Sequence, residues 1–534
     1  MSKKETQKQL DSLENVELAI YLDEEKTKSI PSKDSGYYYD LEKSSCTNGA
    51  YINWDSVSWS PVVKNLTTYP TRCDIHFTKT YTEGILNGAD PIIKDELIPV
   101  TIDSDGTVKK ANLETPWYSY ADKNWANAII LKDESTASNY KEGSVIKEEA
   151  IESYFVWIPK YRYQLWDLGQ YEGLTAIDES KVHEIPIIFG NYNTGDEKIG
   201  ECTTPMESGE TGNCQVGDYM THPAFLSIPS TGFWVGKFET GYDGASSTSE
   251  AHQNIRDASK IIIKPNVYSW RSIQVANAFY TSYDYKRNLD SHMMKNTEWG
   301  AVAYLQHSKY GSTTSVRINN NSTYLTGYAA NNEPTCGNTL GIIEECNKWC
   351  NDGSCNSSYP NSVLASTTGN INGVFDLSGG AWEYTMGVML DQNGQPMSGR
   401  NSIYNSGFNG TFGCPTCDSD TSGLTALTGG YNLPDKKYYD MYIYSFLNTN
   451  QYQMRILGDA TGEMGPFSTK LNISVNRQIS SWYSDEGWSL DISNPWYHRG
   501  GYCTSGDGTG IFAAGGEPGR KNAGVGFRII LNVV

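Results

Sequence analysis

The sequence predicts an α+β protein in which short strands outnumber a few helices. Three observations favour this class: runs of alternating polar and apolar residues recur along the chain, only two segments carry clear helix signals, and long stretches rich in Gly, Ser, Asn and Thr separate them. A chain of 534 residues is also too long for one simple domain. We therefore expect small all-β modules followed by one large domain with little regular secondary structure.

The N-terminal part predicts a small all-β module. Residues 1–15 are polar and charged, and we expect a tether there. Turn residues separate the five strand-like runs that follow, which read VELAIYL, GYYYDL, AYINW, SPVVKNL and CDIHF. Strands of this length and spacing are typical of a compact β module, which we place at residues 16–80. Cys46 and Cys73 could link two of its strands.

Residues 81–150 predict a linking β subdomain. The segments LIPVTI and TVKKANL flank the turn residues 103–106, and Asp-Gly is a strong hairpin dipeptide. The segment WYSYADKNWANAIIL follows. We expect this region to lead the chain into the next domain.

Residues 151–534 are expected to form one large domain. It opens with YFVWIPKYRYQLW and closes with GFRIILNVV, two strand-like segments, and the ends of closed domains commonly pair. One helix is predicted in KNTEWGAVAYLQHSKYG, with its cap at residues 296–298, and another after Ser269, which we expect to act as the cap. The long loops between these elements are where functional residues usually lie.

Composition disfavours two classes of partner. The net charge is −20 and no basic stripe is concentrated anywhere, which argues against nucleic acid and against anionic membranes. No stretch reaches about 18 apolar residues, so no membrane insertion is predicted, and the N-terminus has no features of a secretory signal. The 37 Tyr and 14 Trp suit a binding surface, or equally a Gly-rich fold whose loops need flat side chains to cover them.

The 11 cysteines predict disulfides in preference to a metal site. The group between Cys336 and Cys355 has irregular spacing and no neighbouring His, unlike zinc sites, so loop-linking disulfides are favoured and imply an oxidising final environment. Cys414 and Cys417 lie in a loop rich in Gly, Ser and Thr. We interpret that pair either as a disulfide that closes a short loop or as two free thiols.

Six motifs occur in a characteristic order. They are FWVGKFET at 233–240, WRS at 270–272, NTEWGAVA at 296–303, GVFDLSGGAWEY at 373–384, RGGY at 499–502 and GFR at 526–528. Their order and spacing resemble the C-type-lectin-like domain of the formylglycine-generating-enzyme, or sulfatase-modifying-factor, type. The resemblance runs from about residue 151 to the end of the chain and implies that fold for the large domain.

The last segment has a narrower resemblance, to the variable proteins of diversity-generating retroelements and to related phage and bacterial surface proteins. The stretch WYHRGGYCTSGDGTGIFAAGGEPGRKNAGVGFRIIL carries this likeness, in which Arg-Gly-Gly and Gly-Phe-Arg form a framework and the residues between them face a ligand. Residues 16–80 likewise resemble a β module that precedes such domains in proteins of gut Firmicutes and their prophages.

This resemblance implies a phage tail-tip or surface-displayed adhesin that is not an enzyme. Such a protein binds a bacterial cell-surface glycan or protein through C-terminal loops, and its N-terminal modules attach to other virion or surface proteins. Tail fibres are often homotrimers. A virion or extracellular location reconciles disulfide-type cysteines with the lack of a signal, because phage particles are released by lysis; removal of a leader is the other explanation. A structural virion or pilus component is an alternative role.

The metal ligands that the known reactions of the family require are missing from this sequence. Formylglycine-generating enzymes bind copper through two cysteines in the Arg-Gly-Gly region, where this chain has only Cys503. Related iron-dependent sulfoxide synthases need a cluster of His, and the seven His here show no helical pair. We therefore expect no catalytic residue, no copper and no iron, with a formylglycine-generating-type oxidase as the alternative. His498 could contact a ligand, although packing beside Trp496 and Tyr497 is favoured.

The resemblance also implies a structural calcium site. In the family, side-chain and backbone oxygens of the fourth motif bind Ca²⁺, and a tight loop of oxygen ligands suits that ion. The matching positions are Asp376, Gly379, Ala381 and Glu383. The usual Asn of the motif is Gly380 here, and in the alternative interpretation Glu383 only accepts backbone hydrogen bonds that fix the loop.

The resemblance divides the C-terminal residues into framework and contact positions. The framework positions are expected to be buried, with apolar anchors beneath the loop: Trp299, Trp382, Arg499, Gly500, Gly501, Ile511, Phe512 and Arg528. Polar residues among glycines are expected to face the ligand: Tyr502, Thr504, Ser505, Asp507, Thr509, Glu517, Arg520, Lys521 and Asn522. Aromatic residues of the preceding loop could stack on a sugar ring or pack on each other: Trp482, Tyr483, Trp488, Trp496 and Tyr497.

Overall fold

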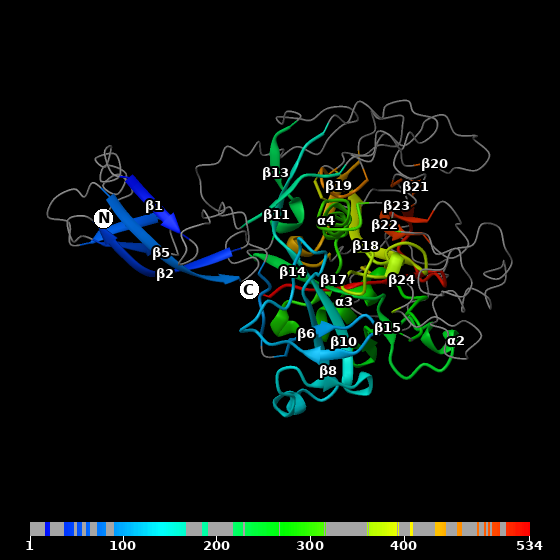
Figure 1. Ribbon diagram of the computed structural model, residues 1–534. Coiled ribbons are helices and arrows are strands. Elements are labelled where there is room, and N and C mark those ends of the chain that lie inside the picture. The colour runs from blue at the N-terminus through cyan, green and yellow to red at the C-terminus, as the bar shows by residue number, and fades with distance from the viewer. Residues whose placement is uncertain are drawn as a thin grey trace. The chain divides into compact units, whose positions relative to one another are not determined.

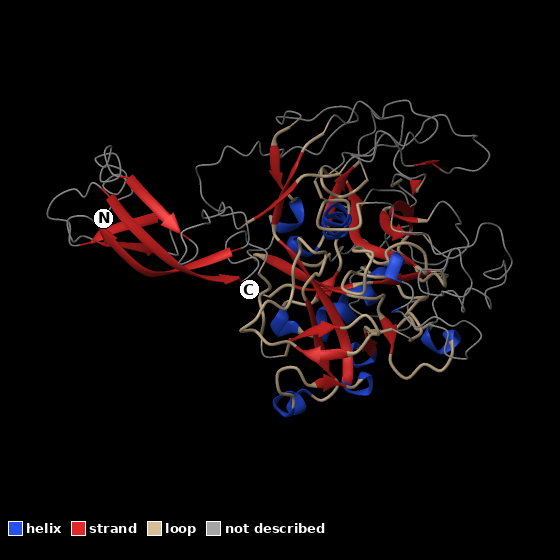
Figure 2. Ribbon diagram, viewed as in Figure 1, coloured by secondary structure: helices blue, strands red, loops and turns tan. Residues whose placement is uncertain are grey.

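The computed structural model describes five strands between residues 17 and 81, and then residues 90–166, 184–190, 217–313, 363–394, 433–444, 456–461 and 485–533 with short gaps, together with 316, 360, 406–408 and 478–479. Two compact units are present. Met1–Asp90 and Glu114–Pro116 form the N-terminal unit, and Pro91–Leu113 and Trp117–Val534 form the C-terminal unit. Strands predominate over a few short helices (Figures 1 and 2), which confirms the predicted α+β class.

The N-terminal unit consists of two small sheets in the described residues. Its strands are β1 (Glu17–Tyr21), β2 (Tyr37–Cys46), β3 (Tyr51–Asp55), β4 (Ser60–Lys64) and β5 (Arg72–Tyr81). β5 lies between β1, to which it is parallel, and β2, to which it is antiparallel, while β3 and β4 form an antiparallel hairpin. Each strand overlaps one of the five predicted runs, because alternating residues bounded by turn residues are a local signal.

An eight-stranded sheet forms one part of the C-terminal unit. Its order is β17-β25-β14-β10-β8-β6-β7-β9. The bounds are β6 (Ile98–Ile102), β7 (Val108–Lys110), β8 (Asn127–Leu131), β9 (Val145–Ile146), β10 (Ile151–Pro159), β14 (Gly232–Gly236), β17 (His292–Met293) and β25 (Ile529–Leu531). β6 and β7 are the predicted hairpin.

The boundary expected near residue 150 falls inside this sheet. β8 pairs antiparallel with β10, so the strands of the expected linking subdomain belong to the same sheet as the start of the large domain. Both edges of β10 are occupied, by β8 and by β14, and most of its residues are buried. A strand this apolar needs partners at both edges, and residues 98–131 supply one of them.

The two ends of the expected large domain do not pair directly. β14 lies between β10 and β25 and bonds to both. Trp157 of β10 lies opposite Trp234 of β14, with ring centroids 5.3 Å apart, and both indoles are fully buried. The first and last strands of this domain are therefore joined through the strand of the FWVGKFET motif.

A seven-stranded sheet carries the C-terminal motifs. Its bounds are β18 (Trp382–Leu390), β19 (Asp440–Ile443), β20 (Gln478–Ile479), β21 (Glu486–Gly487), β22 (Trp496–Gly500), β23 (Gly510–Glu517) and β24 (Val525–Phe527). β18 is antiparallel to β22 and parallel to β19 and β24. The Trp-Glu motif thus begins the strand to which both the Arg-Gly-Gly and the Gly-Phe-Arg strands bond.

Helices are short in the described residues. They are α2 (Thr248–Ala251), α3 (Val275–Tyr285) and α4 (Asn296–Gln306). α4 confirms the first predicted helix, but its N-cap is Lys295, so the residues 296–298 predicted as the cap form the first turn. The Glu298 carboxylate accepts a hydrogen bond from the Lys295 N–H, 2.8 Å away. The prediction that Ser269 caps the second helix was wrong. α3 begins six residues later, and the Ser269 hydroxyl bonds to Glu239 instead.

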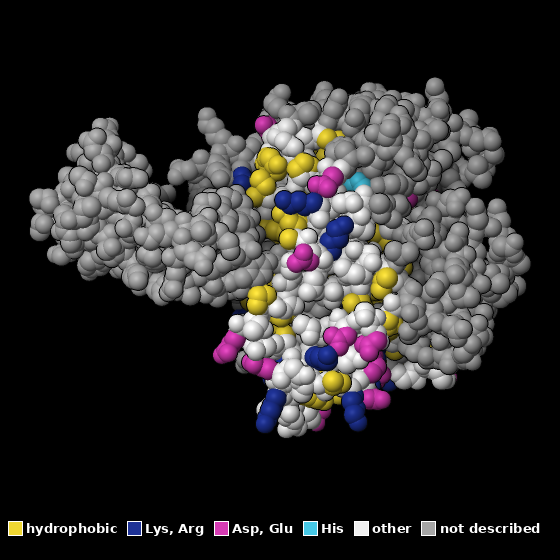
Figure 3. Space-filling view, in the orientation of Figure 1, with side chains coloured by type: hydrophobic (Ala, Val, Ile, Leu, Met, Phe, Trp, Pro, Cys, Tyr) yellow, Lys and Arg dark blue, Asp and Glu magenta, His cyan; other side chains and the backbone are white. Residues whose placement is uncertain are grey.

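Two smaller sheets complete the C-terminal unit. β11 (Tyr161–Gln164) lies between β12 (Ile187–Phe189) and β13 (Tyr219–Thr221), and β15 (Gly241–Tyr242) pairs with β16 (Ile261–Ile262). On the face drawn in Figure 3, the described Lys, Arg, Asp and Glu side chains are interspersed. No continuous basic surface is present among the described residues of that face, in agreement with the net negative charge.

Candidate functional site

The loop between β23 and β24, residues 517–524, is held by its backbone. The Val275 N–H at the start of α3 donates to the Gly519 carbonyl, and the Ser272 N–H donates to the Asn522 carbonyl, both at 3.1 Å. The Tyr384 hydroxyl donates to the Arg520 carbonyl at 2.8 Å. The Trp382 N–H donates to the Gly524 carbonyl at 3.0 Å. Four carbonyls of one loop are therefore fixed by residues more than 130 positions earlier in the chain.

The side chains of this loop are polar and reach solvent to different degrees. Arg520 is exposed, whereas Glu517, Lys521 and Asn522 are partly exposed. The Asn522 amide donates to the Glu517 carboxylate at 3.4 Å. Burial raises the pKa of Glu517, and the nearby Arg520 opposes that shift. The structure thus brings together four of the predicted contact residues, on a rigid backbone and with both signs of charge.

Three other predicted contact residues are buried, so their expected role needs correction. Trp496 is fully buried and stacks on Phe408, with centroids 5.5 Å apart. Tyr497 packs edge-on against Tyr442 at 4.8 Å, and Thr509 has no exposed surface. Trp496 and Tyr497 lie in β22, where the rings of Phe408 and Tyr442 pack on them, and Thr509 directly precedes β23. The other expected contacts lie outside the described residues: Tyr502, Thr504, Ser505, Asp507, Trp482, Tyr483 and Trp488.

The framework arginines are buried and hydrogen-bonded, as predicted. Arg499 donates to the carbonyls of Asp459, Ala460 and Ala513 at 2.8–2.9 Å and to the Asn296 amide oxygen at 3.1 Å. A buried guanidinium is tolerated only when its donors are satisfied in this way. The predicted burial of the other framework side chains is confirmed for Trp299, Trp382, Ile511, Phe512 and Arg528.

Residues 376–383, the loop of the fourth sequence motif, are hydrogen-bonded to the loop 517–524 and to strand β22. Besides the bond from Trp382 to Gly524, the Gly379 N–H donates to the Gly500 carbonyl at 3.0 Å. Gly379 has a φ of +89°, which glycine adopts without strain, and Asp376 has a φ of +64°. The preceding residues 371–373 are held by Lys237, whose buried ammonium donates to the carbonyls of Ile371 and Gly373 and to Asn127.

Three buried carboxyl groups and one guanidinium meet beneath this loop. Arg528 donates through Nε to Glu383 Oε2 at 2.9 Å and through Nη2 to Glu383 Oε1. Glu239 accepts from the Ala381 N–H at 2.9 Å and from the Ser269 hydroxyl, and its own N–H donates to Asp376 Oδ2 at 3.4 Å. If all four groups were ionised, the buried cluster would carry two uncompensated negative charges.

The pKa values of these carboxyl groups reflect their burial and this excess of negative charge. Burial first, and then the charges of Glu383 and Asp376, raise the pKa of Glu239 to about 8. Burial raises the pKa of Asp376 to about 7, although Arg528 opposes the shift. Burial also raises the pKa of Glu383, again against Arg528. The cluster can be neutralised by protons or by a bound cation.

The residues around Asp376 fit a hard cation in the chemistry of their donors. Asp376 Oδ1, Ser378 Oγ and Thr240 Oγ1 are buried and have no hydrogen-bond partner among the described residues. All are oxygen donors, which Ca²⁺ prefers. Glu383 already bonds to Arg528 through both oxygens. In the described part of the chain, no three His, Cys, Asp or Glu residues are grouped as metal ligands, so an ion held by the Asp376 carboxylate would also rely on hydroxyl and carbonyl oxygens.

Glu239 was not among the predicted site residues, although a signal was present. It lies in the FWVGKFET segment next to strand β14, where the neighbouring side chains are buried. A charged residue in such a segment needs a partner, and this one is found at Ala381 and Ser269. The sequence does not reveal those partners, because they lie far from Glu239 along the chain.

His498 lies next to Arg499 and is stacked on an aromatic ring. It lies 4.0 Å from the Trp382 ring, centroid to centroid, with the planes 11° apart. Burial first, and then the charge of Arg499, lower the pKa of His498 to about 3, so the ring is neutral at physiological pH. The favoured interpretation, packing among aromatic side chains, agrees with this contact, although the stacked partner is Trp382.

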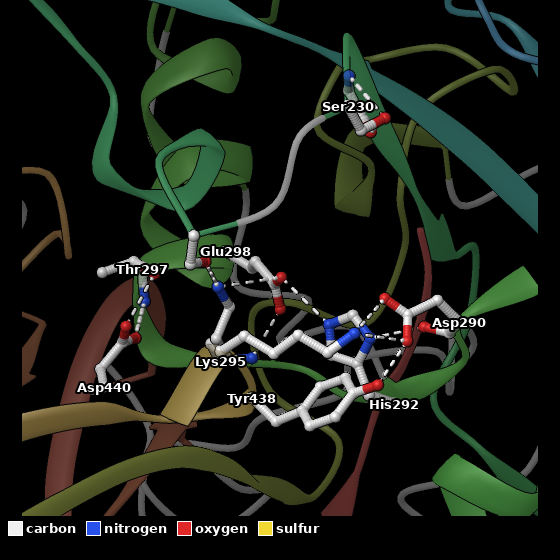
Figure 4. Close-up of polar contacts among 11 residues, drawn as sticks. Ser230, Asp290, His292, Lys295, Thr297, Glu298, Tyr438 and Asp440 are labelled. Carbon is white, nitrogen blue, oxygen red and sulfur yellow. Dashed lines mark hydrogen bonds and ion pairs between the residues drawn. The ribbon is translucent and has the colours of Figure 1, made fainter. Parts of the chain in front are cut away.

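A second polar cluster fixes the start of α4 (Figure 4). The His292 ring bonds to Glu298 at 3.1 Å and to the Asp290 carbonyl at 2.8 Å, and the Lys295 ammonium donates to the Ser227 hydroxyl at 2.6 Å. Asp440 accepts from the Thr297 N–H at 2.6 Å. The side chains of His292, Lys295 and Glu298 are at most 2% exposed, so these three residues support the fold and offer no surface to a ligand.

No protein-family model matches the chain, and no curated protein matches it either. Among the described residues, no helix is both long enough and apolar enough to cross a membrane.

Proposed function

We propose that the chain is a receptor-binding adhesin of a phage tail tip or a bacterial surface, with a C-type-lectin-like domain of the formylglycine-generating-enzyme type over residues 151–534. Its C-terminal loops bind a cell-surface glycan or protein, and its N-terminal modules attach it to other virion or surface proteins. One observation carries the proposal. The loop 517–524 is fixed through four backbone carbonyls while the Arg520 side chain is exposed.

A rigid loop with polar side chains of both signs favours binding over chemistry. Fixing the backbone in advance lowers the entropy that a binding loop loses when it meets its ligand. Arg520 and Lys521 supply hydrogen-bond donors, and Glu517 and Asn522 supply acceptors. Together these groups can recognise the hydroxyl and carboxylate groups of a glycan or the polar groups of a protein surface.

Calcium is proposed as a structural cofactor of this platform. Asp376 and the oxygen atoms around it would hold the ion, and Glu239 would share its charge. When bound, the ion supplies positive charge to the carboxyl cluster. Because the loop 376–383 bonds to Gly500 and Gly524, holding it in place also holds both ends of the contact region.

The test is binding of labelled full-length protein to a panel of gut bacteria. The variant carries Glu517→Ala, Arg520→Ala and Lys521→Ala. The control carries Lys132→Ala, Glu142→Ala and Lys147→Ala, which match those charges at exposed positions more than 350 residues before this loop in the sequence. We expect strain-selective binding that the control keeps and the variant loses by at least tenfold. Equal binding by both variants would show that the binding site lies outside this loop. A lack of binding to every strain would overturn the adhesin proposal.

A further inference from the structure

Strands β2 and β5 bring two cysteines to facing positions in the N-terminal unit. The antiparallel register begins with Tyr37 opposite Tyr81 and continues to Leu41 opposite Phe77. It then shifts by one residue between Leu41 and Lys43, and it ends with Cys46 opposite Cys73. Without this bulge, the first register would place Cys46 opposite Arg72.

The spacing of facing residues in such a pair suits a disulfide. Directly opposed Cα atoms in an antiparallel sheet lie about 4.5 Å or about 5.5 Å apart, depending on whether the pair is hydrogen-bonded. Cα atoms joined by a disulfide lie about 4.4–6.8 Å apart. Both kinds of facing pair are therefore within the Cα range of a disulfide.

We propose that Cys46 and Cys73 form a cross-strand disulfide in the mature protein. A soluble disulfide such as oxidised glutathione serves as the oxidant. One cysteine thiolate attacks it, forming a mixed disulfide and releasing one glutathione thiolate; the second cysteine thiolate then attacks the mixed disulfide and releases the other. Two protein thiols become one disulfide, and the oxidant takes up the two electrons.

This bond would join the elements that the N-terminal unit most needs to hold together. β5 is the central strand of a three-stranded sheet, and β2 is one of its edges. The segment between the two cysteines contains the hairpin of β3 and β4. Small sheets are marginally stable in water, and a cross-link that closes a loop of this length removes much of the entropy of the unfolded chain.

Peptide mapping tests the bond directly in the full-length protein. The protein is refolded with oxidised and reduced glutathione, free thiols are alkylated, and trypsin is added without reductant. Cleavage after Lys43, Lys64, Arg72 and Lys79 places the two cysteines in separate peptides with one cysteine each. We expect one linked pair, residues 44–64 with 73–79, as the main form. Alkylation of both cysteines, or links from either to another cysteine, would overturn the proposal.

A register variant separates this bond from accidental oxidation. Cys46→Ser combined with Ser45→Cys moves the thiol by one residue, to the position opposite Asp74. Because successive strand residues point to opposite faces, we expect the linked peptide to fall at least tenfold in yield. An unchanged yield would show that the register does not direct the bond. Cys46→Ser with Cys73→Ser serves as the reference, in which the linked pair of peptides 44–64 and 73–79 should be absent.

Discussion

Arg528 and Glu383 form a buried ion pair in which the guanidinium donates to both carboxylate oxygens. Each side chain is 1% exposed. The pair joins the Gly-Phe-Arg motif at the end of the chain to the Trp-Glu motif, 145 residues earlier. Next to it lie two further carboxyl groups, those of Glu239 and Asp376, which have no guanidinium of their own among the described residues.

Glu383→Gln should destabilise the folded chain by about 1.5–3 kcal/mol, because it removes the carboxylate to which Arg528 donates two charge-assisted hydrogen bonds. Urea unfolding followed by tryptophan fluorescence measures the change. Asp103→Asn removes a partner from the exposed Lys109–Asp103 pair and should leave the midpoint almost unchanged. Equal effects of the two substitutions would contradict a stabilising role for the buried pair.

Stability in calcium-free buffer should fall as the pH rises from about 4 to about 8. The folded chain raises the pKa of Glu239 to about 8 and that of Asp376 to about 7, above the values near 4 of an unfolded chain. The folded state therefore holds protons that the unfolded state releases. Its advantage is full below the unfolded pKa values and is lost as the pH passes through the folded ones. Urea midpoints across this range measure the fall.

The variant Glu239→Gln tests the origin of that pH dependence. Gln keeps the shape of the protonated acid but has no ionisable group, so the midpoint should fall less steeply with pH than in the unmodified chain. A fall of equal steepness in both proteins would assign the pH dependence to other groups.

Calcium should raise the melting temperature at neutral pH, and chelation should reverse the effect. Ligand at 100 times its dissociation constant stabilises a folded state by about 2.7 kcal/mol. Asp376→Gly should abolish the calcium response, since glycine keeps the positive φ of this position and removes only the carboxylate. Glu142→Ala, at an exposed position, should keep it. The absence of any calcium effect on the unmodified chain would argue that protons alone neutralise the cluster.

Gly300→Ala should destabilise the protein even though Gly300 lies in helix α4. Alanine in a helix is ordinarily favoured over glycine by about 1 kcal/mol. Here an added Cβ would overlap the Gly458 carbonyl oxygen and lie 2.7 Å from the Asp459 Cα, so backbone would have to move. We expect a loss of about 1–3 kcal/mol, as for overpacked cores. A gain in stability in urea unfolding would show that the helix and residues 458–459 are not in close contact.

Features that depend on neighbouring residues could be predicted from the sequence. The five strands of the N-terminal unit, the β6–β7 hairpin and helix α4 lie where alternation, turn residues and helix periodicity indicated them. The burial of Arg499 and Arg528 was also predicted, because the resemblance of their motifs to a known family implies framework positions, and both side chains are buried. Ser269 shows the limit of local signals: its hydroxyl could cap a helix, but Glu239 is the partner it bonds.

By itself, the sequence determined the α+β class, the short strands and the polar composition of the C-terminal loop, since each depends on residue type and local spacing. Only the tertiary structure decided which groups meet. Glu239 lies 137 positions before Asp376, and a single bulge sets Cys46 opposite Cys73. Packing against Phe408 and Tyr442 buries Trp496 and Tyr497. The physical reason is that strand pairing is nonlocal: backbone hydrogen bonds between distant segments, satisfied together, determine which side chains become neighbours.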